Sequence, residues 1–321
     1  MKTIKEIFDT AAQKLVKITD KQQLVVAVHD GTFHADDILC AAMLRYIYGA
    51  NVQVIRSRNQ YVLGTAHFIL DVGGKDEVKE HQVWFDHHSK EKETYDNGIM
   101  MAACGKLARF LLADIDQYYY NFLKENLLYM VEAEDNGQNA ADFNLPNNPF
   151  SFVHCFNLQD FEGYSIMSQQ EKAFNDASML ATKVFDRINS RYVQLCKDMD
   201  VFEESLKSYD NNGYLFLNTH INMSLVLEYN EKHEKPIVLI SFYDKGKKDY
   251  KLQVVPVKDG SFDSYIKMPK AWRGLRDSEL DKVTGLTGSV FVHPAGFLGG
   301  WKEEEQVKKA AQMTLEANET M

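Results

Sequence analysis

Residues 82–89, QVWFDHHS, place an apolar run directly before one aspartate and two histidines, Asp86, His87 and His88. Three consecutive ionisable side chains are costly to bury unless a partner holds them. Successive side chains of a strand point to opposite faces, so these three converge on one pocket only where the strand opens into a loop. The chemistry they offer there is metal binding, since imidazole and carboxylate groups are both metal ligands.

Three further segments deliver the same residue types directly after an apolar run. Their sequences are HDGTFHADD, ILDVGG and AEDNG. In an open parallel sheet, ligands bind beyond the carboxyl ends of the strands, so we expect these segments to meet at one edge. The residues they contribute are His29, Asp30, His34, Asp36, Asp37, Asp71 and Asp135.

The shared donor set indicates a transition-metal centre. Imidazole and carboxylate ligands without a thiolate suit Mn²⁺, Fe²⁺, Zn²⁺ or Co²⁺ better than a pure Mg²⁺ or Ca²⁺ site. Six or seven such side chains are too many for one structural ion and suit two ions that share a carboxylate. Two ions about 3.5–4 Å apart activate water for phosphoester hydrolysis. The other histidines are expected to be hydrogen-bonded or exposed: His67, His81, His154, His220 and His233.

Strands and helices alternate in the first third of the chain, which is typical of an α/β fold with a parallel sheet flanked by helices. Apolar, β-branched runs predict the strands, and apolar residues at helical spacing predict the helices. The expected strands span 23–30, 51–58, 67–74 and 82–89, and the expected helices span 35–49, about 98–135 and about 167–207.

The stretch 116–130, DQYYYNFLKENLLYM, is rich in tyrosine and could be taken for a base-stacking platform. A surface that stacks bases interleaves aromatic residues with Lys or Arg. Lys124 is the only such residue in this stretch. We therefore expect the stretch to form core or the contact of a homodimer.

The pattern changes at the turn SYDNNGY, residues 208–214. Beyond it, the runs YLFLNT, PIVLISFY and YKLQVVPV predict strands, and SLVLEYNEK predicts a helix. We therefore predict a metal-binding catalytic domain over 1–207, which includes a long linking helix. A smaller α+β substrate domain is predicted over 208–321.

Two segments of the second domain suit phosphate binding. VHPAGFLGG supplies His293 and three glycines, whose N–H groups can approach an anion closely. AWRGLRD supplies Arg273 and Arg276, and a guanidinium fork matches phosphate. Alone, the same residues would indicate a glycine-rich turn with basic surface residues. The glycines are Gly296, Gly299 and Gly300, and further basic candidates are Lys267, Lys270, Arg56 and Arg58.

The 321-residue chain has a formal net charge of −10, which argues against a general nucleic-acid-binding surface. Residues 236–300 hold ten Lys or Arg and seven Asp or Glu, a net charge of +3, which leaves −13 for the rest. A metal-binding part and a phosphate-handling part would explain this division, and so would solvated surface. Because affinity for a phosphate backbone comes largely from Lys and Arg, we expect short substrates.

Cysteine spacing and hydropathy indicate the compartment. The four cysteines form no C-x-x-C pair, which is typical of reduced thiols in the cytoplasm. No apolar run approaches about 18 residues, and the N-terminal segment has neither a secretory nor a transit pattern. We therefore expect a cytoplasmic protein that does not associate with membranes.

The motifs HDGTFHADD, ILDVGG, FDHH and AEDNG, in this order, resemble the DHH phosphoesterase superfamily. That superfamily includes RecJ-type exonucleases, short-oligonucleotide hydrolases and manganese-dependent inorganic pyrophosphatases. HDGTFHADDILCAAMLR, AWRGLRDSEL and GSVFVHPAGFLGGW narrow the resemblance to the melanocyte-proliferating-gene (MYG) exonuclease family. The resemblance covers about residues 24–301 and implies a DHH-type domain followed by a substrate domain.

The resemblance also implies roles for individual residues. Asp71 matches the bridging carboxylate, and His88 matches the residue that faces the scissile phosphate. Asp86 matches a residue that orients the histidines through hydrogen bonds. The implied metal ligands are His29, His34, Asp36, Asp71, His87 and Asp135.

The first motif departs from the superfamily's usual His-x-x-x-Asp-x-Asp. Here His29 is followed by four residues and then by His34-x-Asp36. The extra imidazole replaces a carboxylate and removes one negative charge. Metal preference can therefore differ from that of the pyrophosphatases.

These observations predict a hydrolase with two divalent ions, Mn²⁺ foremost and Mg²⁺ included, that acts as a 3′→5′ exonuclease on single-stranded RNA or short oligonucleotides. Arg273 and His293 would stabilise the developing charge and a neighbouring phosphate. The alternative on the same fold is hydrolysis of pyrophosphate, a cyclic dinucleotide or a nucleotide. Two others are a zinc deacetylase, which would leave FDHH and AEDNG without a role, and a non-catalytic binding module.

Overall fold

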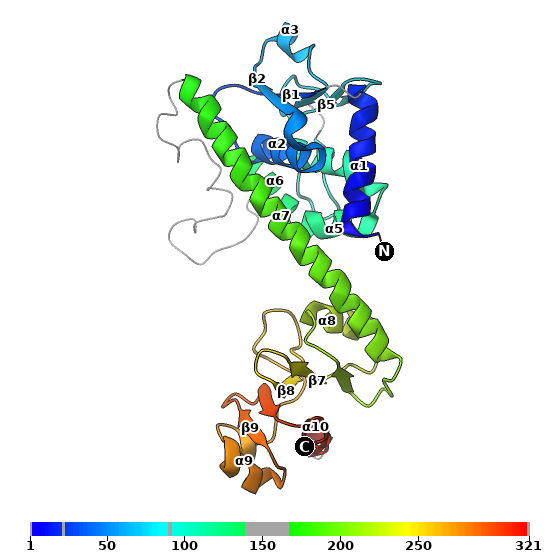
Figure 1. Cartoon of the computed structure of the whole chain (residues 1–321), viewed down its shortest axis with the longest axis vertical. Helices are drawn as coiled ribbons and strands as arrows, with labels where there is room; N and C mark the ends of the chain where they lie inside the picture. The colour runs from blue at the N-terminus through cyan, green and yellow to red at the C-terminus, as the bar shows by residue number, and fades with distance from the viewer. Residues whose placement is uncertain (1, 21–22, 89–91, 139–166, 320–321) are drawn as a thin grey trace. The chain divides into compact units, whose positions relative to one another are not determined.

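Figure 1 shows the structure, a computed structural model that describes residues 2–20, 23–88, 92–138 and 167–319. Contacts divide the chain into two compact units, Met1–Val193 and Gln194–Met321, each with its own sheet. The division falls within helix α7 (Met167–Leu206), whereas the sequence suggested a boundary at the end of that helix.

The first unit is built on a five-stranded sheet with the order β2-β1-β3-β5-β4. Four of the strands are parallel, and the two-residue β4 pairs antiparallel with β5 at the edge. This is the parallel α/β sheet that the sequence predicted. The strands are β1 (Leu24–Val28), β2 (Val52–Arg56), β3 (Phe68–Leu70), β4 (Glu77–Val78) and β5 (Val83–Phe85).

Side chains alternate between the two faces of this sheet, as the strand geometry requires. On one face, Trp84 packs with Leu63 of the short helix α3 (Gln60–Leu63). On the other face, Phe85 contacts Phe110 of the helical layer, with ring centroids 5.7 Å apart. Both faces are therefore covered, which suits the apolar runs seen in these strands.

The helices of the first unit pack mainly around α2, which contacts α1, α4 and α6. Two π-helical segments follow α4 and α5, so the helical stretch expected near 98–135 is present but interrupted. Tyr119 and Tyr120 are buried, as expected for core. The helices are α1 (Ile4–Thr19), α2 (Ala35–Tyr48), α4 (Ala103–Ala108), α5 (Gln117–Leu123) and α6 (Tyr129–Asp135), and the π segments are Arg109–Ala113 and Lys124–Leu128.

The part of α7 that belongs to the first unit lies alongside α2 (Figure 1). The Tyr46 hydroxyl donates a hydrogen bond to Asp186 at 3.1 Å, and the buried Tyr119 hydroxyl donates one to Asn189 at 2.6 Å. These bonds attach the long helix to the helical layer. In the parts of the chain that the structure describes, no helix combines the length and apolar character needed to cross a membrane.

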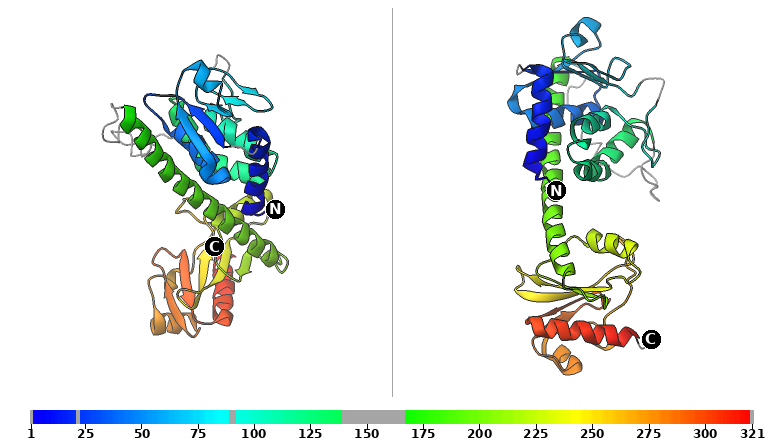
Figure 2. Two further views of the ribbon diagram at one scale, coloured as in Figure 1. Left: turned by 45° about the horizontal axis from the view of Figure 1, so that its top comes forward. Right: turned by 90° about the vertical axis from the view of Figure 1, so that its right-hand side faces the viewer.

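The second unit has a five-stranded sheet with the order β6-β7-β8-β10-β9, in which β6 and β7 are parallel and the other pairs are antiparallel. Figure 2 shows α8 and α10 on opposite faces of this sheet. This is the α+β arrangement that the sequence predicted. The elements are β6 (Tyr214–Leu217), α8 (Met223–Lys232), β7 (Leu239–Asp244), β8 (Asp249–Val254), α9 (Asp277–Thr284), β9 (Ser289–Val292), β10 (Leu298–Trp301) and α10 (Glu304–Glu319).

Gly105 of α4 lies against a buried carboxylate of α6. A Cβ at Gly105 would be 1.8 Å from Glu132 Oε1 and 2.5 Å from the Tyr95 hydroxyl oxygen. Glu132 is held in place, because Oε1 accepts the N–H of Ala102 at 2.9 Å. We expect Gly105→Ala to lower the free energy of unfolding by about 3 kcal/mol, measured by urea denaturation. Gly64→Ala is the control, since its Cβ would make ordinary contacts; equal losses in the two variants would contradict the packing argument.

Candidate metal centre

Three neighbouring parallel strands end at the candidate metal centre. β1 is followed by His29, β3 by Asp71 and β5 by Asp86. The strand order reverses at β1, because β2 lies on one side of it and β3 on the other. Such a switch point leaves a crevice beyond the carboxyl ends of the strands, where open α/β sheets bind their ligands.

Asp71 lies between two histidines and has a left-handed backbone conformation, with φ of 56°. Its Oδ2 is 3.2 Å from His29 Nε2, and its Oδ1 is 3.1 Å from His87 Nε2. Both oxygens are buried, and neither has a partner with hydrogen-bond geometry among the described residues. An uncommon backbone conformation of this kind persists where the surroundings fix it, often at functional sites. Each oxygen of Asp71 therefore faces a different histidine.

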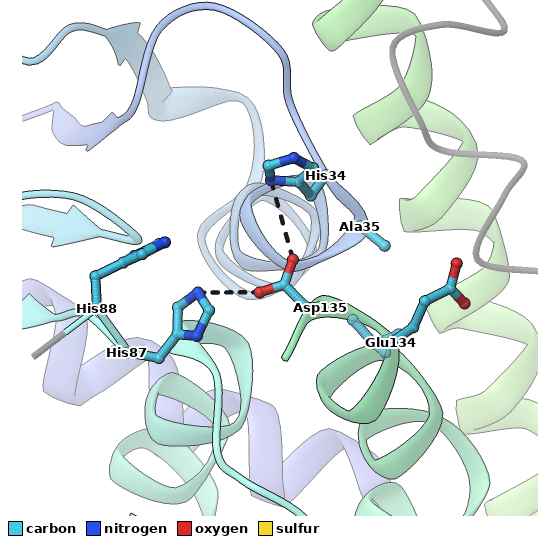
Figure 3. A pocket seen from close by; sticks show the side chains of 7 residues that line it. His34, Ala35, His87, His88, Glu134 and Asp135 are labelled. Atoms are coloured by element: carbon cyan, nitrogen blue, oxygen red, sulfur yellow. Dashed lines mark ion pairs between the residues drawn. The ribbon is translucent and has the colours of Figure 1, made fainter. Parts of the chain in front are cut away.

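Asp135, at the end of α6, brings two further histidines into the cluster (Figure 3). Its Oδ2 is 3.0 Å from His87 Nε2, and its Oδ1 is 4.0 Å from Nδ1 of His34, the residue that precedes α2. The structure thus brings together all six ligands that the resemblance implied. Groups whose donor atoms lie within 4.8 Å of one another are His29, His34 and Asp71; Asp71, His87 and His88; and Asp36, His87 and Asp135.

Hydrogen bonds determine which ring nitrogen of each histidine faces the cluster. His29 Nδ1 donates to the carbonyl oxygen of Asp30 at 3.0 Å, and His87 Nδ1 donates to Asn136 Oδ1 at 3.0 Å. These bonds leave Nε2 of each ring facing Asp71, so Nε2 is the nitrogen that a metal ion would take once its proton is lost. The sequence analysis gave Asn136 no role, although it lies in the AEDNG motif.

Asp86 holds the turn that carries His87 and His88. Its Oδ1 accepts the backbone N–H and Nδ1–H of His88 at 2.9 and 2.8 Å, and its Oδ2 accepts the N–H of Gly74 at 2.6 Å. The His88 side chain is 63% exposed. Its ring is therefore oriented by Asp86 and still accessible to a substrate.

Asp37 is a buried carboxylate that the sequence analysis placed among the converging residues but left out of the implied metal ligands. Its Oδ1 accepts the N–H of His34 at 2.9 Å. Its Oδ2 has no hydrogen-bond partner among the described residues and lies 3.4 Å from His29 Nε2. The sequence signal for Asp37 was its place beside Asp36, because adjacent residues in the first turn of α2 can both lie near the strand ends.

The N-terminal amides of helix α4 bind carboxylates of α2 and α6, two of the helices that carry residues of the cluster. The N–H groups of Ala103 and Cys104 donate to the buried carboxylate of Asp36 at 3.1 and 2.7 Å. The N–H of Ala102 donates to Glu132 of α6, the helix that ends in Asp135. The amides at the start of α4 therefore attach α2 and α6 to the same point.

Lys106 of α4 supports the histidine turn. Its side chain is 2% exposed, and Nζ donates to the backbone oxygen of Asp86 at 3.0 Å and to Asp76 Oδ2. Asp76 Oδ1 in turn accepts the N–H of Asp86 at 3.0 Å. A buried ammonium group is retained only with such partners, because its desolvation is costly. The sequence gave no signal for this pair, since it joins a helix and a turn 30 residues apart.

The cluster shifts the pKa values of its members when no metal is bound. Burial opposes protonation of His29, but contact with Asp71 and the charge of Asp37 outweigh it and raise the pKa of His29 to about 9. Burial likewise opposes protonation of His87, but Asp135 and Asp71 raise its pKa to about 11. Burial raises the pKa of Asp37 to about 7. Protons thus balance charge in the cluster, and a divalent cation can replace them.

A pocket of about 300 Å³ opens onto these groups (Figure 3). Its volume is at the lower end of the range for small-ligand pockets. The lining residues are His34, Ala35, His87, His88, Val131, Glu134 and Asp135.

Arg56 is not available to a substrate, contrary to one of the alternatives from the sequence. Its side chain is 1% exposed, and its guanidinium packs against the rings of Phe33 and Phe174, at 5.4 and 5.2 Å from their centroids. It also donates a hydrogen bond to the carbonyl oxygen of Gly31. Arg56 therefore supports the loop between the first two histidine ligands.

The predicted phosphate-binding residues lie in the second unit. His293 is exposed at the turn between β9 and β10. Gly296 in this turn has φ of 73°, and a Cβ there would be 2.6 Å from Arg273 Nε. Arg273 Nε donates to the carbonyl oxygen of Met268 at 2.9 Å, so Gly296 leaves room for Arg273 to pass. Arg276 is exposed.

Gly299 and Gly300 have a different role from the expected one. They lie inside β10, which pairs with β8 on one side and β9 on the other, so their amides belong to the sheet. A Cβ at Gly299 would be 2.8 Å from the Trp301 ring. Packing against Trp301 therefore requires glycine at position 299. Because both residues lie in a strand paired on both sides, their amides do not form the anion-binding loop that the sequence suggested.

A family model described as MYG1_exonuc, uncharacterised protein family (UPF0160), matches residues 25–315. The chain belongs to this family. MYG1 protein C694.04c of Schizosaccharomyces pombe is 28% identical over 333 residues, which cover 91% of this chain and 97% of that protein. The MYG1 exonuclease of Mus musculus is 25% identical over 328 residues, which cover 90% of this chain and 84% of that protein.

Two solved structures resemble the fold distantly. RecJ of Thermus thermophilus, in complex with Mn²⁺, has a TM-score of 0.29 and 14% identity; the match covers 98% of this chain and 54% of RecJ. An exopolyphosphatase-related protein of Bacteroides fragilis has a TM-score of 0.24 and 11% identity, with 96% of each chain covered. Membership of the MYG1 family, together with the histidine and aspartate cluster, makes the chain a metal-dependent phosphoesterase.

We expect metal binding by this MYG1 family member to release about two protons at pH 7, from His29 and His87. Both pKa values lie above 7, so both rings are protonated without metal and must become neutral to bind it. Affinity should therefore rise with pH above 7, most steeply up to about 9, where His29 loses its proton, and less steeply from there to about 11, where His87 does. Calorimetry in buffers of different ionisation enthalpy measures the release; a pH-independent affinity would contradict this protonation state.

We expect Lys106→Met to weaken metal binding by about 10–100-fold, because the turn that carries His87 loses its support from behind. Methionine fills a similar volume, so the fold should be retained. Lys75→Met is the matched control, since Lys75 is exposed in the neighbouring turn. Equal metal affinity of the two variants in a titration would show that Lys106 is only structural.

Proposed function

We propose that this chain is a 3′→5′ exonuclease that removes nucleotides from single-stranded RNA or short oligonucleotides, using water activated between two divalent ions, Mn²⁺ foremost. The observation that carries this proposal is Asp71, whose two buried oxygens face two different histidines without making hydrogen bonds. Relatives over most of the chain are named MYG1 exonucleases, which supports a nucleic-acid substrate.

The donor groups suggest how the ions are held. Asp71 belongs to two of the three groups of donor atoms, and the third group, with Asp135 of α6, is joined to them through His87. When bound, two divalent ions lower the pKa of a water between them and stabilise charge on the phosphoryl oxygens. The proposed ligands are His29, His34 and Asp71 for one ion and Asp36, His87, Asp135 and Asp71 for the other, with Asp37 beside His29.

His88 is the proposed contact to the scissile phosphate. Its Nδ1 donates to Asp86, its ring is exposed, and it lines the pocket at the cluster. A ring held in this way can bind a phosphate oxygen without a further change of orientation. In the second unit, Arg273, Arg276 and His293 are proposed to bind neighbouring phosphates, because guanidinium and imidazole groups suit them.

The proposed compartment is the cytoplasm. Cys40 and Cys104 are buried free thiols, which suits a reducing environment. The small pocket at the cluster also favours a second candidate function, hydrolysis of pyrophosphate or a nucleotide, and the assay below separates the two.

The test is cleavage of 5′-labelled single-stranded RNA and DNA oligonucleotides in Mn²⁺, with EDTA and Asp71→Asn as controls. Asparagine tolerates the left-handed conformation of Asp71, so this variant should fold and lose only the bridging charge. We expect a ladder that shortens from the 3′ end, lost in EDTA, with the rate of Asp71→Asn lower by about 100-fold or more.

Pyrophosphate and a mononucleotide are assayed beside the oligonucleotides. Intact oligonucleotides with hydrolysis of either small substrate would favour the second candidate function. Cleavage that starts inside the strand would exclude an exonuclease, and full activity of Asp71→Asn would exclude the bridging role.

A further inference from the structure

Large apolar side chains are exposed at one end of the second unit. Phe262 is fully exposed, and Val257, Tyr265 and Phe297 are each more than 40% exposed. Phenylalanine is among the residues most often buried, so a fully exposed ring at a loop tip is uncommon. Side chains of this kind, grouped together, mark interaction surfaces.

Backbone hydrogen bonds bring these residues to the same end of β8. The segment that follows β8 folds back on itself, and the N–H of Tyr265 donates to the carbonyl oxygen of Val255 at 3.4 Å. The turn between β9 and β10 reaches the same end, because the N–H of Val254 donates to the carbonyl oxygen of Phe297 at 2.9 Å. Phe262 lies between Val255 and Tyr265 in the chain, at the tip of the folded-back segment.

The same region is basic in an acidic protein. Residues 257–276 contain five Lys or Arg and two Asp, a net charge of +3, whereas the whole chain has −10. Lys258, Lys267 and Lys270 are exposed, and none of them forms an ion pair within the described residues. Their charges are therefore available to a polyanion.

Aromatic and cationic groups also meet in the neighbouring turn. The rings of His293 and Phe297 are 4.5 Å apart, and both side chains are exposed. Exposed aromatic rings interleaved with Lys and Arg are the combination with which proteins hold single-stranded nucleic acid, because every base has a face that can stack. In the tyrosine-rich stretch 116–130, Lys124 is the only Lys or Arg, and its Nζ is 5.1 Å from the ring centroid of Tyr120. Tyr119 and Tyr120 are themselves buried, so their faces are closed to a base.

We propose that Phe262, Tyr265 and Phe297, with Lys258, Lys267 and Lys270 around them, form a base-stacking surface for single-stranded nucleic acid. The proposal rests on the proposed function, since it describes how the substrate beyond the cleaved nucleotide is held. Stacking does not depend on base sequence, so such a surface can hold any single strand.

The test measures binding without cleavage, by fluorescence anisotropy of a labelled single-stranded RNA with the full chain in EDTA. We expect Phe262→Ser to weaken binding by about fivefold or more. Tyr61→Ser is the matched control, since Tyr61 is an 89% exposed aromatic residue of the first unit. Its affinity should equal that of the unchanged chain.

Phe262→Trp supplies a direct signal of stacking. Its affinity should be retained, and its fluorescence should be quenched by the RNA but not by an abasic strand with the same number of phosphates. No effect of Phe262→Ser, or equal weakening for the abasic strand, would overturn the proposal. Unchanged binding by Phe262→Ser would point instead to an apolar protein partner for this surface.

Hydrolysis of bis(p-nitrophenyl) phosphate in Mn²⁺ by the unchanged chain separates this proposal from the proposed function. Hydrolysis without base-dependent RNA binding would support the metal centre and contradict the stacking surface. Base-dependent RNA binding without hydrolysis would support the stacking surface and contradict the proposed nuclease activity.

Discussion

Carboxylates can be gathered at the ends of β1, β3 and β5 only if positive charge is brought to the same place. Asp36, Asp37 and Asp71 are all buried, and like charges at this spacing oppose one another. Imidazole groups reduce the conflict when they hold protons, as the raised pKa values of His29 and His87 indicate. Divalent ions would reduce this repulsion further, because each ion carries two positive charges where a proton carries one. The rest of the first unit is arranged around this requirement.

Helix α4 shows how the requirement shapes the surrounding fold. Its first amides bind Asp36 and Glu132, and its Lys106 supports the backbone of Asp86. These contacts join α2, α6 and the turn after β5, the elements that bear most of the donor atoms. Gly105 lets the helix approach α6 closely enough for this to happen. A change in α4 therefore reaches the metal centre without touching a ligand.

The sequence predicted the parallel sheet, the two-part organisation and the meeting of the four His/Asp segments. These followed from local patterns, because short apolar runs define strands and parallel strands end at a common edge. Strand lengths were overestimated: the run 67–74 yields only the three residues of β3, since the segment after it turns at Asp71 with positive φ.

What the sequence could not predict depends on contacts between distant segments. Lys106 and Asp76 are 30 residues apart, and no local pattern relates them. Arg56 is the last residue of β2, and only the tertiary structure shows its guanidinium packed against Phe33 and Phe174. Gly299 and Gly300 fit a glycine-rich loop by composition, yet pairing on both sides places them in a strand.

Binding of a polyanion is opposed by the negative charge of the protein, because both units are net negative. A unit that collects carboxylates for metal repels a polyanion, and residues 1–193 hold 26 Asp or Glu against 19 Lys or Arg, a net charge of −7. Screening limits that repulsion to about 10 Å at moderate salt, so it acts mainly near the centre itself. A few lysines cannot offset it through phosphate contacts alone. Stacking of bases on aromatic side chains gives affinity that does not depend on net charge, so the proposed surface around Phe262 suits an acidic chain.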